Sequence, residues 1–379
     1  MKKNYIYAPG PVAVPPQVLA ATAKPMIHHR SADFDPLFKK CCEGLKGIFQ
    51  TSNPVVTLAS SGTGAMEAAI VSSASPGDLV LSVESGKFSQ RWGLMAEAFG
   101  MKVERINVEW GNDVDPSQIA DFLKKHPETR QVIVELCETS TGTLTDVKAV
   151  GEVVRGTDAL LLVDAVSGLC ADELRTDEWG VDMVGTGSQK GVMLPPGLGF
   201  VSVSAKAQEA IKASKSPKFY FNLAKYLKQL EANTTPFTPA VSLIFGLEAA
   251  LDMLLGEGME NVWKRHARLA EAARQAMRAI GCEMFSNNPA NTCTAVRVPD
   301  GVEGGKIVKT LREKFGMIIA GGQDHLKGKI FRFATLGYYD DFDVITIVDG
   351  VEQTLALLGH KFQRGAGVNA ALEYFEKNQ

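Results

Sequence analysis

Two short apolar segments, each followed by one ionisable residue, constrain this chain more than any other feature of its sequence. Residues 159–163 form a continuous apolar run that ends at Asp164. Residues 181–184 form a second, mostly apolar run, followed by a Gly/Ser/Thr-rich turn that carries Lys190. Such runs, bounded by polar and small residues, are typical of strands buried on both faces of a parallel sheet. Because open α/β sheets bind ligands at the carboxyl ends of their strands, we expect Asp164 and Lys190 at one binding edge.

A carboxylate and an amine at the same sheet edge suit one cofactor well. Pyridoxal phosphate (PLP) requires a lysine for its Schiff base and an acid that keeps the pyridine nitrogen protonated. Each residue also has an ordinary structural interpretation. Asp164 can cap the next turn, and Lys190 can be a solvated surface charge. These two residues alone leave both interpretations open.

Composition narrows the class of protein. The 379 residues are enough for two or three domains, and 45% hydrophobic with 22% charged residues is ordinary for a globular chain. The net charge of −3, without blocks of like charge, favours neither nucleic acid nor an anionic membrane as partner. Scattered cysteines and histidines lack CxxC or HExxH spacing, which predicts a reducing compartment and no metal site. Without a secretory signal or a run of ~18 apolar residues, we expect a cytoplasmic location and no membrane span.

The N-terminal part of the chain contains an arm and a candidate phosphate loop. Residues 1–16 are rich in Pro and Gly and are expected to form an extended arm, which can cover this chain or a neighbouring subunit. The apolar run 55–59 leads into the turn SSGTG (60–64) and a helical segment. Free amides at such a helix N-terminus can bind phosphate. The turn has neither GxGxxG nor GxxxxGK[ST] spacing, which weakens the case for a dinucleotide or a nucleoside triphosphate.

Three further positions have both a functional and a structural interpretation. Phe88 follows the strand expected at 76–83 and can stack on a planar ring or begin a core-facing helix. Thr139 lies in the polar turn ETSTGT, whose hydroxyls can contact a ligand or cap a helix. Arg332 lies in an otherwise apolar strand and can be paired structurally or bind an anion.

The pattern of elements changes near residue 259. Before it, we expect helices at 34–49 and 206–231 and a strand at 200–204 that closes the sheet. After it, a long amphipathic helix (260–280) precedes the alternating strands 291–298 and 329–334. We therefore predict an arm (1–16), a large domain (17–258) and a smaller α+β domain (259–379).

Taken together, these segments resemble the class V, fold-type-I PLP aminotransferases of the alanine–glyoxylate and serine–pyruvate group. The resemblance covers nearly the whole chain, and the motifs that carry it are APGPVAVPP, SSGTGAMEAA, GKFSQRWG, ETSTGT, LLLVDAVSG, DMVGTGSQKG, PPGLGF, TPFTPAVSL and KIFRFATLG. It implies an α/β fold with a large, mostly parallel seven-stranded sheet and a smaller C-terminal α+β domain.

The resemblance also implies roles for individual residues. Lys190 would hold PLP as a Schiff base and move the proton, and Asp164 would pair with the pyridinium nitrogen. Arg332 would bind the substrate α-carboxylate, with Gly10 close to the substrate. The remaining cofactor contacts would be Ser61, Gly62, Thr63, Gln189, Phe88, Thr139 and, from the partner subunit, Thr235 or Thr238.

The implied reaction is ping-pong transamination between alanine or serine and glyoxylate or pyruvate, in a homodimer with shared active sites. One carboxylate-binding arginine favours small monocarboxylic substrates, an inference that weakens if Arg30 or Arg91 faces the pocket. Gln189 before the lysine, in place of the histidine usual in cysteine desulfurases, disfavours sulfur transfer.

The alternatives are another donor such as 2-aminoethylphosphonate, a catalytically idle partner subunit, or a dehydrogenase built on the same α/β pattern. The intact Asp164 and Lys190 argue against an idle subunit, and the missing dinucleotide fingerprint argues against a dehydrogenase.

Overall fold

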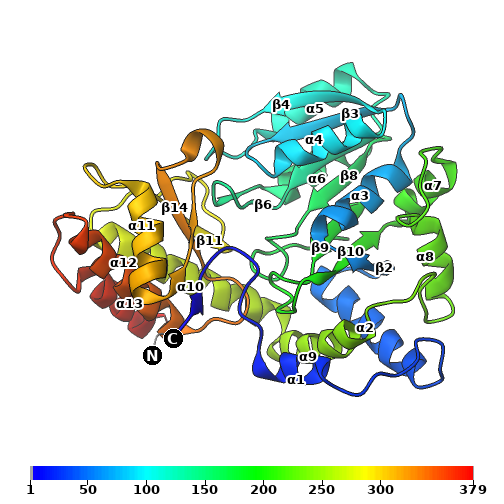
Figure 1. The fold of residues 1–379 in the computed structure, drawn as a ribbon. Helices are drawn as coiled ribbons and strands as arrows, with labels where there is room; N and C mark the ends of the chain where they lie inside the picture. Colours follow the sequence, from blue (N-terminus) through cyan, green and yellow to red (C-terminus); the bar gives the residue numbers. More distant parts are fainter. Residues whose placement is uncertain (1–2, 379) are drawn as a thin grey trace.

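The computed structural model describes residues 3–378 and is built around a seven-stranded sheet (Figure 1). All of its strands run parallel except β10, which is antiparallel to both of its neighbours. From one edge to the other, the strands are β2 (Val55–Ser60), β10 (Gly197–Val203), β9 (Met183–Gly187), β8 (Leu160–Asp164), β5 (Gln131–Glu135), β3 (Leu79–Glu84) and β4 (Lys102–Asn107). The prediction of a large, mostly parallel seven-stranded sheet is confirmed.

The place of β10 corrects one prediction. The strand expected at 200–204 exists, but it does not close the sheet, because β2 lies outside it at the edge. Strand β2 comes early in the chain and pairs with β10 from Ser60↔Gly197 to Val55↔Ser202. The antiparallel direction of β10 therefore leaves the carboxyl ends of β2, β9, β8, β5 and β3 at one common edge.

Helices cover both faces of this sheet because alternate side chains of each buried strand enter opposite cores. On β5, for example, Val132 and Val134 enter one core and Ile133 the other. The first core is covered by α1 (Pro16–Thr22), α2 (Phe34–Phe49), α5 (Pro116–Lys125), α6 (Val147–Val154) and α9 (Val241–Glu257). The second is covered by α3 (Gly62–Ser73), α4 (Ser89–Ala98), α7 (Ala205–Ala213) and α8 (Leu223–Leu230).

The helix expected at 206–231 is in fact two helices, α7 and α8. Residues 214–222 between them are not helical. Pro217 lies within this segment, and proline lacks the N–H that a continuing helix needs. The prediction of one helical segment is therefore wrong between residues 214 and 222.

The C-terminal third packs around its own core. A three-stranded antiparallel sheet runs in the order β11 (Cys293–Arg297), β14 (Ile330–Ala334) and β13 (Ala320–Gly321). Its helices are α10 (Met259–Ala279), α11 (Gly304–Thr310), α12 (Asp341–Leu357) and α13 (Ala366–Lys377), with a π-helical turn (Leu311–Phe315) and a 3-10 turn (Asp324–Leu326). A hairpin of β6 (Cys137–Glu138) and β7 (Thr143–Leu144) faces this region from the large sheet (Figure 1).

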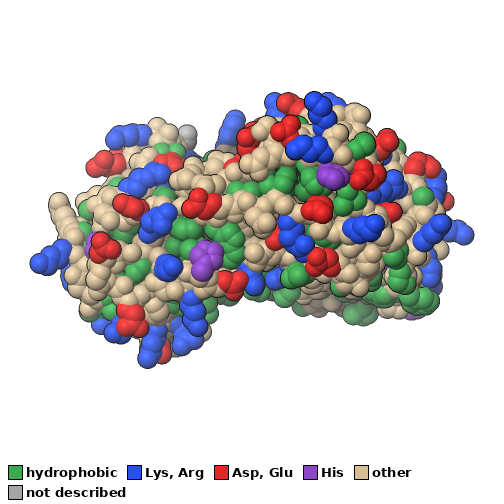
Figure 2. All heavy atoms as spheres, turned by 90° about the horizontal axis from the view of Figure 1, so that it is seen from above, with side chains coloured by type: hydrophobic (Ala, Val, Ile, Leu, Met, Phe, Trp, Pro, Cys, Tyr) green, Lys and Arg blue, Asp and Glu red, His purple; other side chains and the backbone are tan. Residues whose placement is uncertain are grey.

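Helix α10 joins the two regions. Its first turns contribute Met259, Val262 and Trp263 to a core of the large sheet, whereas Leu269 and the turns after it enter the C-terminal core. From above, Figure 2 shows two lobes of unequal size, with positive and negative side chains interspersed on this face. The domain boundary between residues 258 and 259 stays a prediction.

The N-terminal arm lies on its own chain, against both lobes. Strand β1 (Tyr5–Ile6) pairs in parallel with β12 (Met317–Ile318). Tyr7 is buried in the C-terminal core, and Val12 contacts residues of both lobes. Residues 3–15 of the predicted arm thus run across the junction between the lobes, while residues 1 and 2 lie outside the described residues and the bounds of the arm stay a prediction. Within residues 3–378, no helix combines the length and apolarity needed to cross a bilayer.

Candidate active site

A cavity of about 130 Å³ lies at the carboxyl edge of the large sheet. Most of its lining residues lie at or shortly after the carboxyl ends of β2, β3, β5, β8 and β9, which is where open α/β sheets place their ligands. The lining residues are Ser61, Gly62, Thr63, Phe88, Arg91, Trp92, Glu135, Cys137, Thr139, Asp164, Val166, Ser167, Gln189 and Lys190. The structure therefore brings together eight of the predicted site residues: Ser61, Gly62, Thr63, Phe88, Thr139, Asp164, Gln189 and Lys190.

Asp164 is the last residue of β8 and forms part of the cavity floor. Its side chain is 5% exposed, and its Oδ1 accepts a hydrogen bond of 2.7 Å from the Val166 N–H. Burial raises the pKa of Asp164 to about 6, although the Val166 N–H acts in the opposite direction. The hydrogen bond thus fixes the orientation of the carboxyl group, and its pKa lies closer to neutral pH than that of an exposed aspartate.

Lys190 lies in the turn after β9, underneath the N-terminal arm. Its Nζ donates a hydrogen bond to the Pro9 carbonyl, and burial lowers the pKa of this amine below its ordinary value. Gly10 has φ +117°, and a Cβ at this position would lie 2.4–2.6 Å from the Lys190 side chain. The Val12 N–H donates to the Gln189 carbonyl at 3.1 Å. Gly10, absent from the cavity lining, is therefore placed directly against the lysine.

The turn between β2 and α3 forms one end of the cavity. Ser61 caps α3 by accepting a hydrogen bond from the Gly64 N–H at 3.4 Å. A Cβ at Gly187 would lie 3.0 Å from the Gly62 nitrogen, so glycine permits the close approach of β9 to this turn. Gln189 Oε1 is buried and has no hydrogen-bond partner in the described part of the chain. The free amides at the helix N-terminus are donors and fit the phosphate group that the sequence predicts here. Gln189 could contact a phosphate only through its NH₂ group, because its unpaired Oε1 is an acceptor.

Phe88, Trp92 and Arg91 form the cavity wall next to the α3 end. Phe88 precedes α4, and the Arg91 guanidinium lies 5.1 Å from the centre of its ring. Arg91 Nη1 donates to Thr63 Oγ1 at 3.1 Å. Arg91 thus lines the cavity, which meets the condition that weakens the inference of small monocarboxylic substrates, whereas the exposed Arg30 is not among the lining residues.

Arg332 reaches the same region from β14 of the other lobe. The side chain is 4% exposed, Nη1 donates to the Thr139 carbonyl, and Nη2 donates to the Gly321 carbonyl at 2.7 Å. Burial lowers its pKa. These hydrogen bonds go to neutral carbonyl oxygens, which leave the positive charge of the buried guanidinium in place for an anionic ligand. Thr139 itself donates to Ser167 Oγ and links the β6–β7 hairpin to the turn after β8.

Four predicted residues are not among the cavity lining: Gly10, Arg332, Thr235 and Thr238. Gly10 contacts Lys190 and Arg332 contacts Thr139, whereas Thr235 and Thr238 have no such link to a lining residue within the described chain. Thr235 is buried, and its Oγ1 donates to the Phe237 carbonyl at 2.6 Å, while Thr238 is exposed. Their predicted role requires a second subunit and stays a prediction.

Glu135 is a cavity residue that the sequence pattern did not single out. It ends β5 within the segment QVIVE, which by itself indicates only a buried strand. Its side chain is 2% exposed, and Oε1 accepts a hydrogen bond from Trp92 Nε1 at 3.0 Å. The signal that could have found it is the same as for Asp164: an acidic residue at the carboxyl end of an apolar strand.

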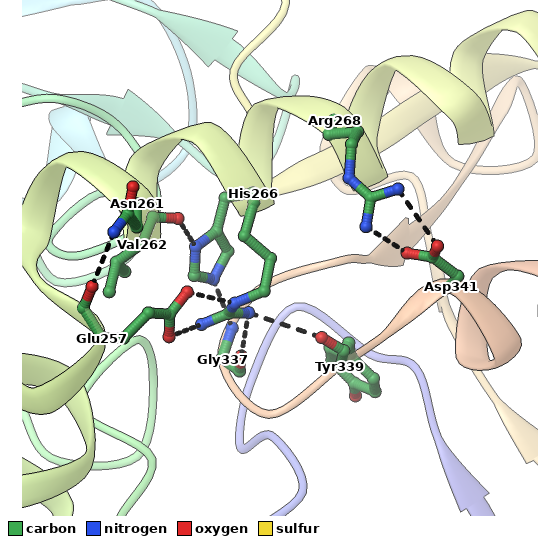
Figure 3. Close-up of polar contacts among 9 residues, drawn as sticks. Glu257, Asn261, Val262, His266, Arg268, Gly337, Tyr339 and Asp341 are labelled. Carbon is green, nitrogen blue, oxygen red and sulfur yellow. Dashed lines mark hydrogen bonds and ion pairs between the residues drawn. The ribbon is translucent and has the colours of Figure 1, made fainter. Parts of the chain in front are cut away.

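Helix α10 holds the segment that follows the strand of Arg332. Figure 3 shows α10 contacting the segment that follows β14. His266 Nδ1 donates to the Val262 carbonyl at 2.7 Å and Nε2 accepts from the Gly337 N–H at 2.9 Å, while burial lowers the pKa of His266 to about 3. Arg265 binds both oxygens of Glu257 and the Gly337 carbonyl, and Arg268 binds both oxygens of Asp341. We call these contacts the α10 junction.

Comparisons with known proteins agree with this geometry. The family model described as "Aminotransferase class-V" matches residues 5–335. The soluble hydrogenase small subunit of Synechococcus sp. is 45% identical over 97% of this chain and 97% of its own length. L-aspartate–glyoxylate aminotransferase of Paracoccus denitrificans is 37% identical over 99% of this chain and 97% of its own. Serine–glyoxylate aminotransferase of Arabidopsis thaliana is also 37% identical, over 99% and 96%.

Among solved structures, pyridoxamine–pyruvate aminotransferase from Mesorhizobium loti superposes with a TM-score of 0.95 at 30% identity. The alignment covers 100% of this chain and 98% of that one. The similarity therefore includes the arm, the large sheet and the C-terminal lobe together.

Proposed function

The chain belongs to the class-V aminotransferase family, and from this premise we propose that it transfers the amino group of a small L-amino acid to a small 2-oxo acid through PLP held by Lys190. One observation carries the proposal: the Lys190 amine and the Asp164 carboxyl group line the same cavity, at the ends of neighbouring strands.

The residues present fit PLP at three points. The α3 N-terminus and the NH₂ group of Gln189 would bind its phosphate, Phe88 would stack on its ring, and Asp164 would accept a hydrogen bond from its ring nitrogen. When bound, PLP supplies an electron-withdrawing ring that stabilises negative charge on the neighbouring carbon of the amino acid. Thr139 and Ser167 would hold the cofactor from the hairpin side.

Lys190 and Arg332 would act on the substrate. With its pKa lowered by burial, the Lys190 amine is unprotonated at neutral pH more often than an exposed lysine, which suits both nucleophilic attachment and proton transfer. Arg332 would exchange a backbone carbonyl partner for the substrate carboxylate, which binds a guanidinium through two parallel hydrogen bonds. Gly10 would lie close to the substrate, because only a residue without a Cβ allows the arm to pass directly against the Lys190 side chain.

We propose glyoxylate or pyruvate as the acceptor and alanine or serine as the donor. Glyoxylate occurs in the names of both 37% identical relatives, whereas their donors differ. Aspartate is the second candidate donor, because Arg91 lines the cavity and could bind a second carboxylate. Its hydrogen bond to Thr63 at the α3 end instead favours a role near the phosphate. A donor such as 2-aminoethylphosphonate is a further alternative within the same family.

An idle partner subunit is the alternative from a different functional class. The name of the 45% identical relative describes a hydrogenase subunit, and that name favours such a role. The pairing of Lys190 with Asp164 in one cavity favours an enzyme instead. We also propose a homodimer, in which Thr235 or Thr238 of one subunit would approach the phosphate end of the other.

The test is the visible absorption spectrum of the purified protein with PLP, before and after addition of L-alanine, L-serine or L-aspartate, for wild type and Lys190→Ala. We expect the band of the lysine-bound cofactor in wild type only, and its loss on addition of alanine or serine. Absence of the band in wild type would contradict the cofactor assignment. A response to aspartate alone would replace the proposed donor. A band that none of the three amino acids changes would contradict the proposed donors and favour another donor, such as 2-aminoethylphosphonate, or the idle subunit.

A further inference from the structure

Glu135 and Asp164 form a pair at the floor of the cavity. The two residues are register partners on the parallel strands β5 and β8, so their side chains leave the sheet on the same face. Neighbouring strands lie about 4.8 Å apart, which places the two carboxyl groups within contact distance. Both side chains are 5% exposed or less, and both line the cavity.

Two buried carboxyl groups at this separation cannot both carry a charge without a large electrostatic cost. Glu138, the third acidic residue nearby, accepts hydrogen bonds from the Phe88, Ser89 and Ser140 N–H groups, which is the pattern of an ionised carboxylate. One proton is therefore expected on either Glu135 or Asp164.

The hydrogen bonds assign this proton to Glu135. Its Oε1 accepts a hydrogen bond from Trp92 Nε1. Its Oε2 is buried, and no donor among residues 3–378 points to it. A carboxylic acid resolves this pattern, since its carbonyl oxygen accepts from the indole and its hydroxyl can donate to a neighbouring carboxylate. Asp164 and Glu138 are both within hydrogen-bond reach, and Asp164, the register partner, has the fewer other donors. Asp164 in turn accepts from the Val166 N–H, which favours its ionised form.

We propose that Glu135 is a positioning residue that remains protonated at neutral pH and donates a hydrogen bond to Asp164, so that Asp164 is the ionised member of the pair. This inference rests on the proposed function only in its consequence: an ionised, hydrogen-bonded Asp164 would pair with the pyridinium nitrogen of PLP. Its physical basis lies in this chain's own residues.

The titration behaviour of the surroundings is consistent with this assignment. Burial, together with the charges of Glu138 and Asp164, raises the pKa of Glu135 well above its usual range. The other titratable groups that act on the pair are Cys137, whose thiol pKa burial also raises, and Lys190, whose positive charge favours ionised Asp164.

The test compares wild type with Glu135→Gln and Glu135→Leu. Glutamine keeps both the acceptor for Trp92 and a donor for Asp164, whereas leucine removes both. We expect the infrared spectrum of the PLP-free wild-type protein at neutral pH to contain the C=O stretching band of a buried carboxylic acid that Glu135→Gln lacks. The difference spectrum is required because burial also raises the pKa of other carboxyl groups, such as Asp113 and Asp172.

The second readout is PLP affinity. Loss of a hydrogen bond to a charged group should weaken binding about tenfold or more in Glu135→Leu, with near wild-type affinity in Glu135→Gln. Absence of the infrared difference band, or equal weakening in both variants, would overturn the proposal. If Glu135→Leu fails to fold, the infrared comparison with Glu135→Gln still decides. If wild type binds no PLP, the proposed function fails, while the infrared result on the protein alone still tests Glu135.

Discussion

The cavity floor and the α10 junction are both buried and polar, but they differ in how completely their groups are paired. At the junction, both nitrogens of His266 have partners, and Arg265 and Arg268 each bind both oxygens of a carboxylate. At the cavity, Glu135 Oε2 and Gln189 Oε1 lack partners within the described chain. Because unpaired buried polar atoms cost stability, a folded chain retains few of them without a reason. Complete pairing agrees with a structural role for the junction side chains. Unpaired atoms alone do not mark a ligand site, because Trp263 Nε1 and Tyr7 Oη are also buried without a partner in the described chain. What distinguishes the cavity is that its ionisable side chains line an open space.

The largest expected effect is on the cavity side. Asp164→Asn should lower transamination about a hundredfold or more, because the negative charge opposite the ring nitrogen is lost. The same variant should keep or raise the stability of the PLP-free protein, since it removes one of two neighbouring carboxyl groups. Activity assays and urea unfolding measure the two effects.

The matched control is Asp172→Asn, which changes a buried carboxyl group outside the cavity lining. It should retain activity. An equal loss of activity in both variants would mean that the cavity carboxylate has no special role.

A smaller effect is expected on the slope of the free energy of unfolding against pH. His266 at the junction and Asp164 at the cavity should contribute slopes of opposite sign. For His266, the pKa is lowered from 6.5 to about 3, so the unfolded state binds more protons in this window and stability falls on acidification. The loss is at most about 1.4 kcal/mol per pH unit. For Asp164, the pKa is raised from 3.8 to about 6, so stability falls as pH rises through that window.

Urea unfolding of the PLP-free protein between pH 4 and pH 7 measures both slopes. His266→Gln should lose the acid sensitivity of wild type. Asp164→Asn should reduce the opposite slope, part of which remains because the pKa of Glu135 is also raised. The exposed His325→Gln serves as control and should leave the profile unchanged. A wild-type profile that His266→Gln does not alter would refute the structural role assigned to the junction.

The smallest expected effect concerns the segment that joins the two regions. Tyr339 donates a hydrogen bond to the Ile6 carbonyl of the arm and stacks on Tyr7 at 5.7 Å. Tyr339→Phe keeps the ring but loses the hydroxyl, which should cost about 1 kcal/mol and increase amide hydrogen exchange in the arm. The 43% exposed Tyr338→Phe is the matched control. Equal exchange in both variants would show that the hydrogen bond does not hold the arm.

The sequence predicted the cavity better than the junction, and the reasons are physical. Asp164 and Lys190 follow apolar strands, a local pattern that fixes their place at the sheet edge. Glu135 has the same local pattern, but a single acidic residue closing one strand does not by itself reveal its neighbour on the next strand. The contacts of Arg265 and His266 join segments about 70 residues apart, and no local periodicity encodes such pairing.

The order of the strands in the sheet could not be predicted from the sequence either. The residues of β10 predict a strand, but only its contacts with β2 and β9 place it inside the sheet. The break between α7 and α8 could have been predicted from the sequence, because Pro217 lies within the segment that was expected to be helical.

The contacts of the arm also determine at which point of translation the arm can take its final place on the protein. The hydrogen bond between Tyr339 and Ile6 joins residues 333 positions apart. At translation rates of about 5–20 residues per second, the arm leaves the ribosome on the order of tens of seconds before its partner exists. Over that time the nascent chain can complete the large sheet while Lys190 still lacks its cover. The arm above the lysine is therefore held by a residue that is translated 333 positions after the arm segment it binds, and a chain that stops before β12 lacks both the strand partner of the arm and Tyr339.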